Sequence, residues 1–350
     1  MSTFQNRELQ WDFVKTILMF LVVYGHVSPA NDNITYAETW NGITRITGLF
    51  VMPLFFIISG YFQSNIQSFN DLISKYKRTV TRILIPLISW GVVYLLVHYF
   101  MSGYLPPIYA PLSFSWFLSA LLFCIISGSL VSFLLNVKET FGWLVMILLQ
   151  LIVILMPFDI FHLSFVFSYY LFGMFIKLVL NKYSIGCLFI CNRVSRSFSS
   201  LCFVIVLSVI IAYLGYNFYP SDSFYFTSNL LKHTDFNFIV YRFILCLIAS
   251  ILFLFWCFKF YENHKRNTIV QRIAVIGRDT LFIYCSHVIF LSLIYSPFLS
   301  SILGGGLQTF HALSILLVNP IMTIVLYITL QYCCDGFKHS KLLSLLFLGI

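Results

Sequence analysis

The chain has 350 residues, of which 60% are hydrophobic and only 9% are charged. Soluble domains carry about 25% charged residues, so this composition excludes a soluble globular protein, which could not bury so much apolar surface. The formal net charge of +9 would suit a nucleic-acid partner in a soluble protein. Here the positive residues gather in short connections between apolar stretches, so we expect a lipid bilayer and no nucleic acid.

The apolar stretches are long enough to cross a bilayer as helices. A spanning helix needs about 20 apolar residues, and these continuous runs lack the alternation of barrel strands. We therefore predict an all-α, polytopic bundle of about ten spanning helices, forming a single membrane domain over 1–350 without a soluble appendage. The predicted spans are roughly 10–28, 44–63, 79–101, 115–135, 142–157, 162–181, 199–216, 239–260, 278–299 and 311–333.

The distribution of basic residues predicts the topology. Lys and Arg are concentrated in alternate connections, and the outer loops around 102–114 and 300–310 carry no charge. By the positive-inside rule, both termini are cytoplasmic. The predicted inner segments are 64–78, 136–141, 182–198, 261–277 and the tail after 334. The cysteines have neither a disulfide framework nor zinc spacing, so we expect no metal.

The first predicted span carries three ionisable residues, Asp12, Lys15 and His26. At about 100° per residue they share one stripe, with Lys15 near the inner surface and His26 roughly 16 Å further along. Ionisable groups within a bilayer usually mark function. However, Asp12 and Lys15 also suit a snorkelling or mutually paired arrangement, and a buried neutral His is a common structural device. Asp12 lies roughly 20 Å from His26 along the axis, too far to be its direct partner.

The ninth predicted span opens with Gly277-Arg278-Asp279-Thr280-Leu281 and continues to His287. Thr280, Tyr284 and His287 share one face. Arg278 and Asp279 are also typical of a helix start, where an acidic residue suits the positive dipole. His287 lies about halfway across the bilayer, so a functional role is favoured for it.

The second and third spans add two further features. Ser59 and Gly60 would let a neighbouring helix or a ligand approach closely. Lys75, Arg78 and Arg82 precede or begin the third span. Such a basic cluster normally fixes orientation, but it could also hold phosphate groups arriving from the cytosol.

Together these features resemble the membrane acyltransferase-3 family, in particular its stand-alone polysaccharide O-acetyltransferase branch, which includes fucose 4-O-acetylase-like proteins. The resemblance covers most of the chain and keeps the motifs in order. Lys75 and Arg78 keep the family's two-residue spacing, whereas Arg78 and Arg82 are one residue wider apart. The other matching elements are Asp12, Lys15 and His26, the run from Pro53 to Tyr61, Trp116-Phe117-Leu118, Phe172-Gly173, and Gly277 to His287.

The resemblance implies an acyl-coenzyme A donor, most often acetyl-CoA, and a hydroxyl acceptor on an extracytoplasmic glycan or a lipid-linked oligosaccharide. His26 would act as general base, or would itself take the acyl group before passing it on. Lys75, Arg78 and Arg82 would bind the phosphates of coenzyme A. A thioester is already activated, so no metal is required. The expected location is the bacterial cytoplasmic (inner) membrane.

Other residues receive supporting roles in this scheme. Lys15 would support the donor and Asp12 would compensate Lys15. His287 would orient the donor or, with Tyr284, stabilise the oxyanion. The remaining positions expected in the donor channel or its packing are Ser59, Gly60, Trp116, Tyr284 and Arg278.

Two interpretations compete with a transferase. Intramembrane Lys15, His26 and His287 would also serve as proton relays in a transporter or exporter of a surface polysaccharide or its precursor. Against this, the sequence has neither an inverted repeat nor paired Gly/Pro-broken spans. A membrane scaffold without chemistry would not need the aligned Lys15–His26 stripe.

Overall fold

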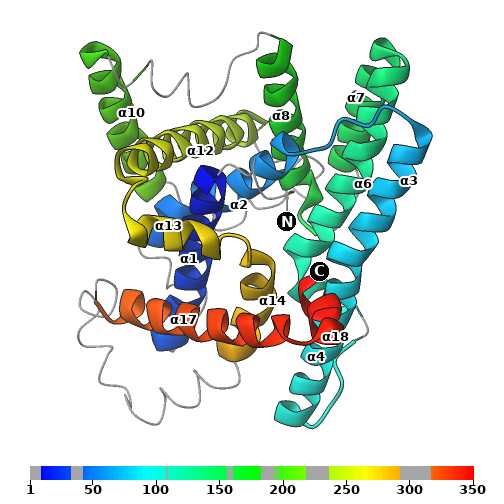
Figure 1. Cartoon of the computed structure of the whole chain (residues 1–350). Coiled ribbons are helices and arrows are strands. Elements are labelled where there is room, and N and C mark those ends of the chain that lie inside the picture. The colour runs from blue at the N-terminus through cyan, green and yellow to red at the C-terminus, as the bar shows by residue number, and fades with distance from the viewer. Residues whose placement is uncertain are drawn as a thin grey trace. The chain divides into compact units, whose positions relative to one another are not determined.

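The computed structural model describes residues 9–32, 42–107, 109–155, 161–182, 194, 197–217, 236–291 and 317–350. These residues form helices and connections without a strand, so the predicted all-α class is confirmed (Figure 1). The elements are α1 (Leu9–Asp32), α2 (Gly42–Tyr61), α3 (Phe69–Thr79), η1 (Val80–Leu84), α4 (Ile85–Ser102), α5 (Ala110–Phe114), α6 (Trp116–Val137), α7 (Glu139–Leu155), α8 (Leu163–Lys182), α10 (Phe198–Asn217), α12 (Phe236–His264), α13 (Thr268–Ile276), α14 (Thr280–Phe290), α17 (Asn319–Lys338), α18 (Lys341–Leu343) and η5 (Ser344–Leu348).

Within the described ranges, seven helical segments are long and apolar enough to cross a membrane, and the α13–α14 pair makes up to eight. The protein is therefore a multi-pass helical membrane protein. α1 and the shorter apolar α7 coincide with two further predicted spans. The span count of about ten stays a prediction, as do the positions of the termini. Residues 292–316, which include the end of the ninth predicted span and the loop 300–310, lie outside the described residues, as does most of 182–198.

Two segments predicted as connections between spans are themselves largely helical. Residues 64–78 contain α3, which begins where Ser68 and Asp71 form a capping box. α3, η1 and α4 then run on without a break to Ser102. Residues 261–277 contain the end of α12 and the whole of α13, which Asn267 caps through its side chain. Local capping residues thus start helices that the hydropathy pattern does not reveal.

The chain divides into two compact units, each assembled from separate stretches of sequence. Unit 1 comprises Met1–Val51, Cys191–Tyr216 and Leu252–Leu343, and unit 2 comprises Met52–Ile190, Asn217–Ile251 and Ser344–Ile350. The boundary between the units falls within α2, after Val51, and within α12, after Ile251.

In unit 1, α1 packs against α13, α14 and α17 (Figure 1). Aromatic side chains join α1 to α12: Trp11 meets Phe258 edge-on at 4.7 Å, and Phe13 lies 5.7 Å from Tyr261, measured between ring centroids. α13 and α14 meet at a bend of 75°. The bend brings the Gly277–Asp279 segment against the buried start of α1.

In unit 2, α6 packs against α3, α7 and α8. Gly60 of α2 faces the backbone carbonyl of Tyr170 on α8, and Gly173 of α8 faces that of Ile57 on α2. A Cβ at either glycine would overlap the opposite backbone. This mutual contact shows that Gly60 permits the close approach of a neighbouring helix, as small residues commonly do in membrane proteins.

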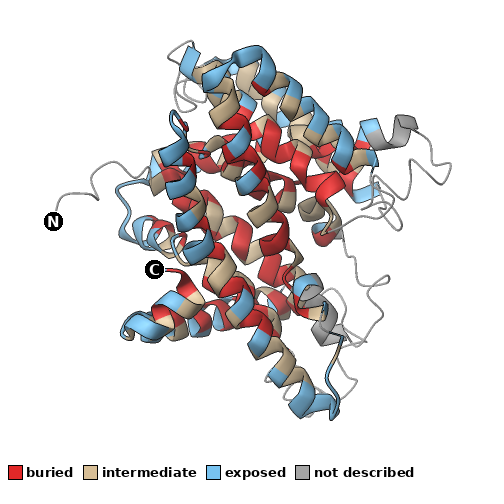
Figure 2. Cartoon of the chain, turned by 90° about the vertical axis from the view of Figure 1, so that its right-hand side faces the viewer, coloured by how far each residue is buried: buried red, intermediate tan, exposed pale blue. Residues whose placement is uncertain are grey.

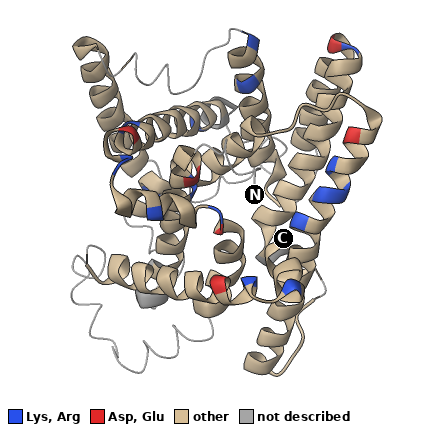
Figure 3. Ribbon diagram, viewed as in Figure 1, with Lys and Arg blue, Asp and Glu red and all other residues tan. Residues whose placement is uncertain are grey.

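Side chains on the surface are mainly apolar, as a lipid environment requires. Buried residues run along the inward faces of the helices, and exposed ones cover their outer faces and ends (Figure 2). Large apolar residues are exposed on α4, α7 and α10, for example Val92, Leu151 and Val209. Charged side chains are sparse along the helices (Figure 3). Because lipid tails can cover such faces, these residues incur no hydration penalty in a bilayer.

Candidate active site

The stripe of ionisable residues on α1 begins with a buried ion pair. Asp12 is 1% exposed, and its Oδ1 accepts a hydrogen bond of 2.9 Å from Lys15 Nζ. Arg278, from the α13–α14 bend, places its Nε 3.8 Å from Asp12 Oδ2. A buried carboxylate requires such countercharges. Asp12 therefore holds Lys15 and Arg278 together, in agreement with the paired alternative drawn from the sequence.

The start of α1 is fixed to α13 by backbone contacts. Thr16 Oγ1 donates a 2.7 Å hydrogen bond to the carbonyl of Ile273. Gly277 lies directly against the carbonyl of Asp12, where a Cβ would overlap backbone atoms. The glycine that opens the ninth predicted motif thus allows the bend to approach α1. The same approach brings Arg278 to Asp12.

Two turns beyond the bend, His287 meets His26. The centroids of the two imidazole rings are 5.0 Å apart, with an angle of 57° between the ring planes. His287 is 1% exposed, and the ring of Tyr284 lies 5.9 Å from it. The structure therefore unites His26, His287 and Tyr284, which the sequence placed on two helices far apart in the chain.

Hydrogen bonding defines which nitrogen of His287 is available for chemistry. Its Nδ1 lies 2.6 Å from the carbonyl oxygen of Tyr284 and 3.0 Å from that of Ile283. Carbonyl oxygens only accept, so Nδ1 carries the hydrogen and Nε2 of the neutral ring presents a lone pair. Among the described residues, nothing hydrogen-bonds to this buried Nε2. It can accept a proton or a hydrogen bond from a reacting group.

The start of α14 is braced from α17. Asp279 occupies the N-cap position, but its side chain forms no cap hydrogen bond. Instead Asp279 Oδ2 accepts 2.7 Å hydrogen bonds from Gln331 Nε2 and from Lys338 Nζ. The interpretation of Asp279 as a simple helix start is therefore incomplete. Gln331 and Lys338, which the sequence did not single out, anchor the helix that carries His287.

The basic residues expected to bind the donor all belong to unit 2. Lys75 is half-buried on α3, and its Nζ donates to Ser64 Oγ at 3.1 Å. Arg78 and Arg82 follow on the same helical run with exposed side chains. In the part of the chain that the structure describes, none of the three has a carboxylate within ion-pair distance. Among the described residues, their positive charges therefore have no carboxylate partner.

One further cation joins this cluster. Lys177 of α8 lies close enough for its charge, like those of Arg78 and Arg82, to act on Lys75. Its Nζ donates a 2.6 Å hydrogen bond to the backbone carbonyl of Gln63. Lys177 was not singled out from the sequence, because it lies near the inner end of the predicted span 162–181, where a lysine can reach the interface.

Ser59 and Trp116 have local roles in unit 2. Ser59 Oγ donates to the carbonyl of Phe55 at 2.8 Å, within α2. Trp116 begins α6, and its ring meets that of His162 edge-on at 4.7 Å. The predicted site residues thus form two sets: the α1 stripe with Arg278, Tyr284 and His287 in unit 1, and the basic cluster with Ser59, Gly60 and Trp116 in unit 2.

Ionisable residues buried between the helices of a polytopic membrane protein commonly mark functional sites, and the described residues bring such groups together on α1 and α14. The profile of the family described as an acyltransferase domain, acyltransferase-3, matches residues 8–332. The chain therefore belongs to the acyltransferase-3 family and is a membrane acyltransferase. This membership does not favour the exporter alternative.

One curated relative matches a short part of the chain. The nodulation protein NolL of Sinorhizobium fredii is 33% identical over 90 residues, which cover 24% of this chain and 24% of NolL. The chain thus spans about a quarter of the length of this relative. No solved structure matches the chain.

Proposed function

We propose that this membrane acyltransferase transfers an acyl group, most simply acetyl, from cytosolic acyl-CoA to a hydroxyl of an extracytoplasmic or lipid-linked glycan. The observation that carries the proposal is the His26–His287 pair, whose rings lie 5.0 Å apart on α1 and α14. Transfer from a thioester to an alcohol needs a base for the hydroxyl proton. An imidazole suits this role because an unprotonated ring nitrogen accepts a proton through its lone pair.

In the proposed reaction, His26 removes the proton of the acceptor hydroxyl. The hydroxyl oxygen attacks the thioester carbonyl, and the tetrahedral intermediate collapses as the carbon–sulfur bond breaks. The coenzyme A thiolate leaves and receives the proton from His26. The acyl group thus ends on the glycan as an ester, and the base returns to its starting state.

His287 assists His26 in this scheme. Two imidazolium ions at such a short separation would repel strongly in a weakly polar interior, so the pair takes up one proton at a time. With Nδ1–H held by backbone carbonyls, His287 Nε2 accepts a hydrogen bond from the acceptor hydroxyl or from His26. Tyr284, whose ring centroid lies 5.9 Å from that of His287, stabilises the oxyanion in this proposal. Lys75, Arg78 and Arg82 bind the donor phosphates.

The proposal is tested in inverted membrane vesicles containing the protein, supplied with labelled acetyl-CoA. We expect alkali-labile label on glycan with the wild-type chain and none with His26→Ala at equal protein level. Label that appears equally with both proteins would remove His26 from the reaction. Absence of label from both, with an acceptor glycan supplied, would remove acetyl-CoA as the donor.

The location and acceptor follow from the same proposal. A bacterial cytoplasmic membrane would give the donor access from the cytosol and the acceptor access from outside, which matches the charge distribution among the predicted connections. The similarity of one segment to a nodulation protein of a bacterium is consistent with this location.

A further inference from the structure

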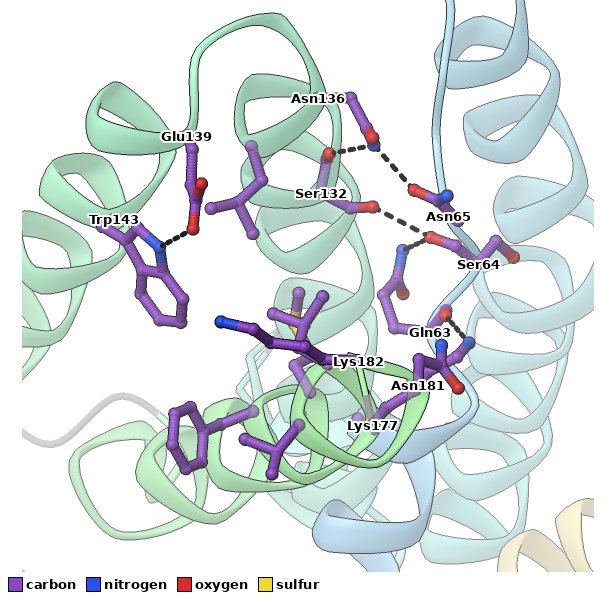
Figure 4. A pocket seen from close by; sticks show the side chains of 16 residues that line it. Gln63, Ser64, Asn65, Ser132, Asn136, Glu139, Trp143, Lys177, Asn181 and Lys182 are labelled. Atoms are coloured by element: carbon purple, nitrogen blue, oxygen red, sulfur yellow. Dashed lines mark hydrogen bonds between the residues drawn. The ribbon is translucent and has the colours of Figure 1, made fainter. Parts of the chain in front are cut away.

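A polar pocket of about 440 Å³ lies in unit 2, where α2, α6, α7 and α8 end or begin (Figure 4). Its size falls within the range of about 300–1,000 Å³ that is typical of small-molecule sites. Three of its rim segments, which hold Ser64 and Asn65, Asn136 and Glu139, and Lys182, belong to connections predicted to be cytoplasmic. A cytosolic ligand would therefore reach this pocket directly.

The floor of the pocket is a rigid hydrogen-bonded network around Gln63. This buried side chain accepts from the Tyr170 hydroxyl at 2.7 Å and donates to Ser129 Oγ at 2.9 Å. Its backbone carbonyl accepts from Lys177 Nζ, which fixes the ammonium group at the floor. Asn136 Nδ2 donates to Asn65 Oδ1 at 2.6 Å and holds the turn after α2 against α6. The polar groups are thus positioned before any ligand arrives.

The charge of the pocket is positive. Figure 4 shows Lys177 and Lys182 on α8: Lys177 reaches Gln63 after the end of α2, and the ammonium group of Lys182 points toward Trp143 of α7. Neither lysine has an ion-pair partner within the described residues. Among the described residues of the lining, Glu139 is the one acidic residue, and its carboxylate accepts from Trp143 Nε1 at 3.4 Å. Lys75, bonded to Ser64 on the wall, adds a third positive charge.

An aromatic wall faces these cations. Trp143 and Phe175 line the pocket with ring centroids 6.3 Å apart. Cations beside amide donors suit a phosphate group, and exposed aromatic faces suit a flat base or an apolar chain. The combination matches an organic phosphate better than an inorganic ion, which would leave the aromatic wall unused.

We infer that this pocket binds an organic phosphate, with Lys177 as its central cation. The inference extends the proposed function and rests on it in one respect: when acyl-CoA is the donor, the pocket takes its phosphate-bearing nucleotide end. The same phosphate chemistry is offered by the head group of an anionic phospholipid. The phosphate accepts hydrogen bonds from Lys177 and Lys182, and Lys75 supplies further positive charge at the wall.

The test measures binding of adenosine 3′,5′-bisphosphate, the nucleotide fragment of coenzyme A, to the full chain in nanodiscs of zwitterionic lipid. We expect saturable binding to the wild type, weakened about tenfold by Lys177→Gln, because one charge-assisted hydrogen bond is lost. Lys177→Arg keeps the charge and should bind within about threefold of the wild type, which separates charge from mere packing. Lys265→Gln, an exposed lysine of unit 1 paired with Glu262, is the matched control and should be unchanged.

A second arm distinguishes the lipid source. Nanodiscs containing phosphatidylglycerol should raise the thermal stability of the wild type, but not of Lys177→Gln, when the ligand is a lipid head group. The inference is supported when either nucleotide binding or the lipid effect is lost in Lys177→Gln and kept in Lys177→Arg. The inference is overturned when Lys177→Gln changes neither nucleotide binding nor the lipid response. It is also overturned when the wild type shows neither of them.

The labelled-transfer assay separates this inference from the proposed function. Nucleotide binding that depends on Lys177, in a protein that transfers no acyl group, would keep the pocket and refute the transferase mechanism. Normal transfer by Lys177→Gln with an unchanged KM for acetyl-CoA would keep the transferase and refute the pocket as its donor site.

Discussion

His287 presents a fixed Nε2 lone pair because its Nδ1–H is held by the carbonyls of Ile283 and Tyr284. Replacing His287 with Gln keeps a polar side chain but removes a proton acceptor of imidazole basicity. We expect acyl transfer to fall about 10²- to 10⁴-fold, the usual contribution of acid–base catalysis, with membrane insertion unchanged. Initial rates of labelled transfer check this. Ser286→Ala, which removes only a hydrogen bond within the same helix, is the control and should stay near wild type. Equal rates for both variants would contradict the role of His287.

We expect Asp12 to act on stability more than on chemistry, because it holds two cations at the start of α1. Removing one partner of a buried ion pair costs about 3–5 kcal/mol, and the partial exposure of Lys15 and Arg278 reduces this figure. Asp12→Asn should therefore lower the thermal midpoint. Adding Lys15→Met should recover part of the loss, because the half-buried cation whose partner was removed is also removed. A double variant that melts below Asp12→Asn would show that the pair is not coupled in this way.

Some site residues could be predicted from the sequence and others could not, and the difference has a physical cause. Asp12, Lys15, His26 and His287 stand out because charge or imidazole is unusual within an apolar segment. The meeting of His26 with His287 depends on how α1 packs against α14, which no local pattern encodes. Lys177 was not predicted, because a lysine near the end of an apolar helix is common. Its hydrogen bond to the Gln63 carbonyl and its place in the pocket lining depend on how α8 packs against the turn after α2, which no local pattern encodes.

Among the helices, the close contact of the α13–α14 bend with α1 depends on Gly277. Gly277→Ala would place a methyl group on the carbonyl of Asp12, so the bend must move away and carry Arg278 and α14 with it. We expect both stability and transfer activity to fall. Gly336→Ala, on α17 where a Cβ meets nothing within 4 Å, is the matched control. It should be neutral or stabilise the protein by about 0.5–1 kcal/mol.

Thermal melting and labelled transfer, measured on Gly277→Ala and Gly336→Ala side by side, give the result. A Gly277→Ala protein as stable and active as the control would mean that the bend tolerates a wider separation than the structure shows.

The helices themselves were predictable, since each predicted span has a helical counterpart where it is described. α3 and α13 were missed because their starts depend on the short capping residues Ser68 and Asn267.

For the protein as a whole, the membrane class followed from composition, because so few charged residues cannot cover a soluble surface. The all-α class followed from the long, continuous apolar runs. The division into two units could not be predicted, since each unit gathers stretches that are distant in sequence.

The predicted orientation of the chain in the membrane has its own test. A green fluorescent protein fused after Ile350 should fluoresce, and an alkaline phosphatase fused there should be inactive, because the positive-inside rule places this end in the cytoplasm. Active phosphatase would reverse the topology, and with it the side from which the donor enters.

The most direct test of the central claim is release of the coenzyme A thiol by the purified protein in nanodiscs, with acetyl-CoA and a soluble glycan acceptor. The measurement compares wild type with His26→Ala, with and without the acceptor. We predict thiol release that requires both the acceptor and His26. Equal thiol release from wild type and His26→Ala would contradict the assignment of His26 as the base that activates the acceptor hydroxyl.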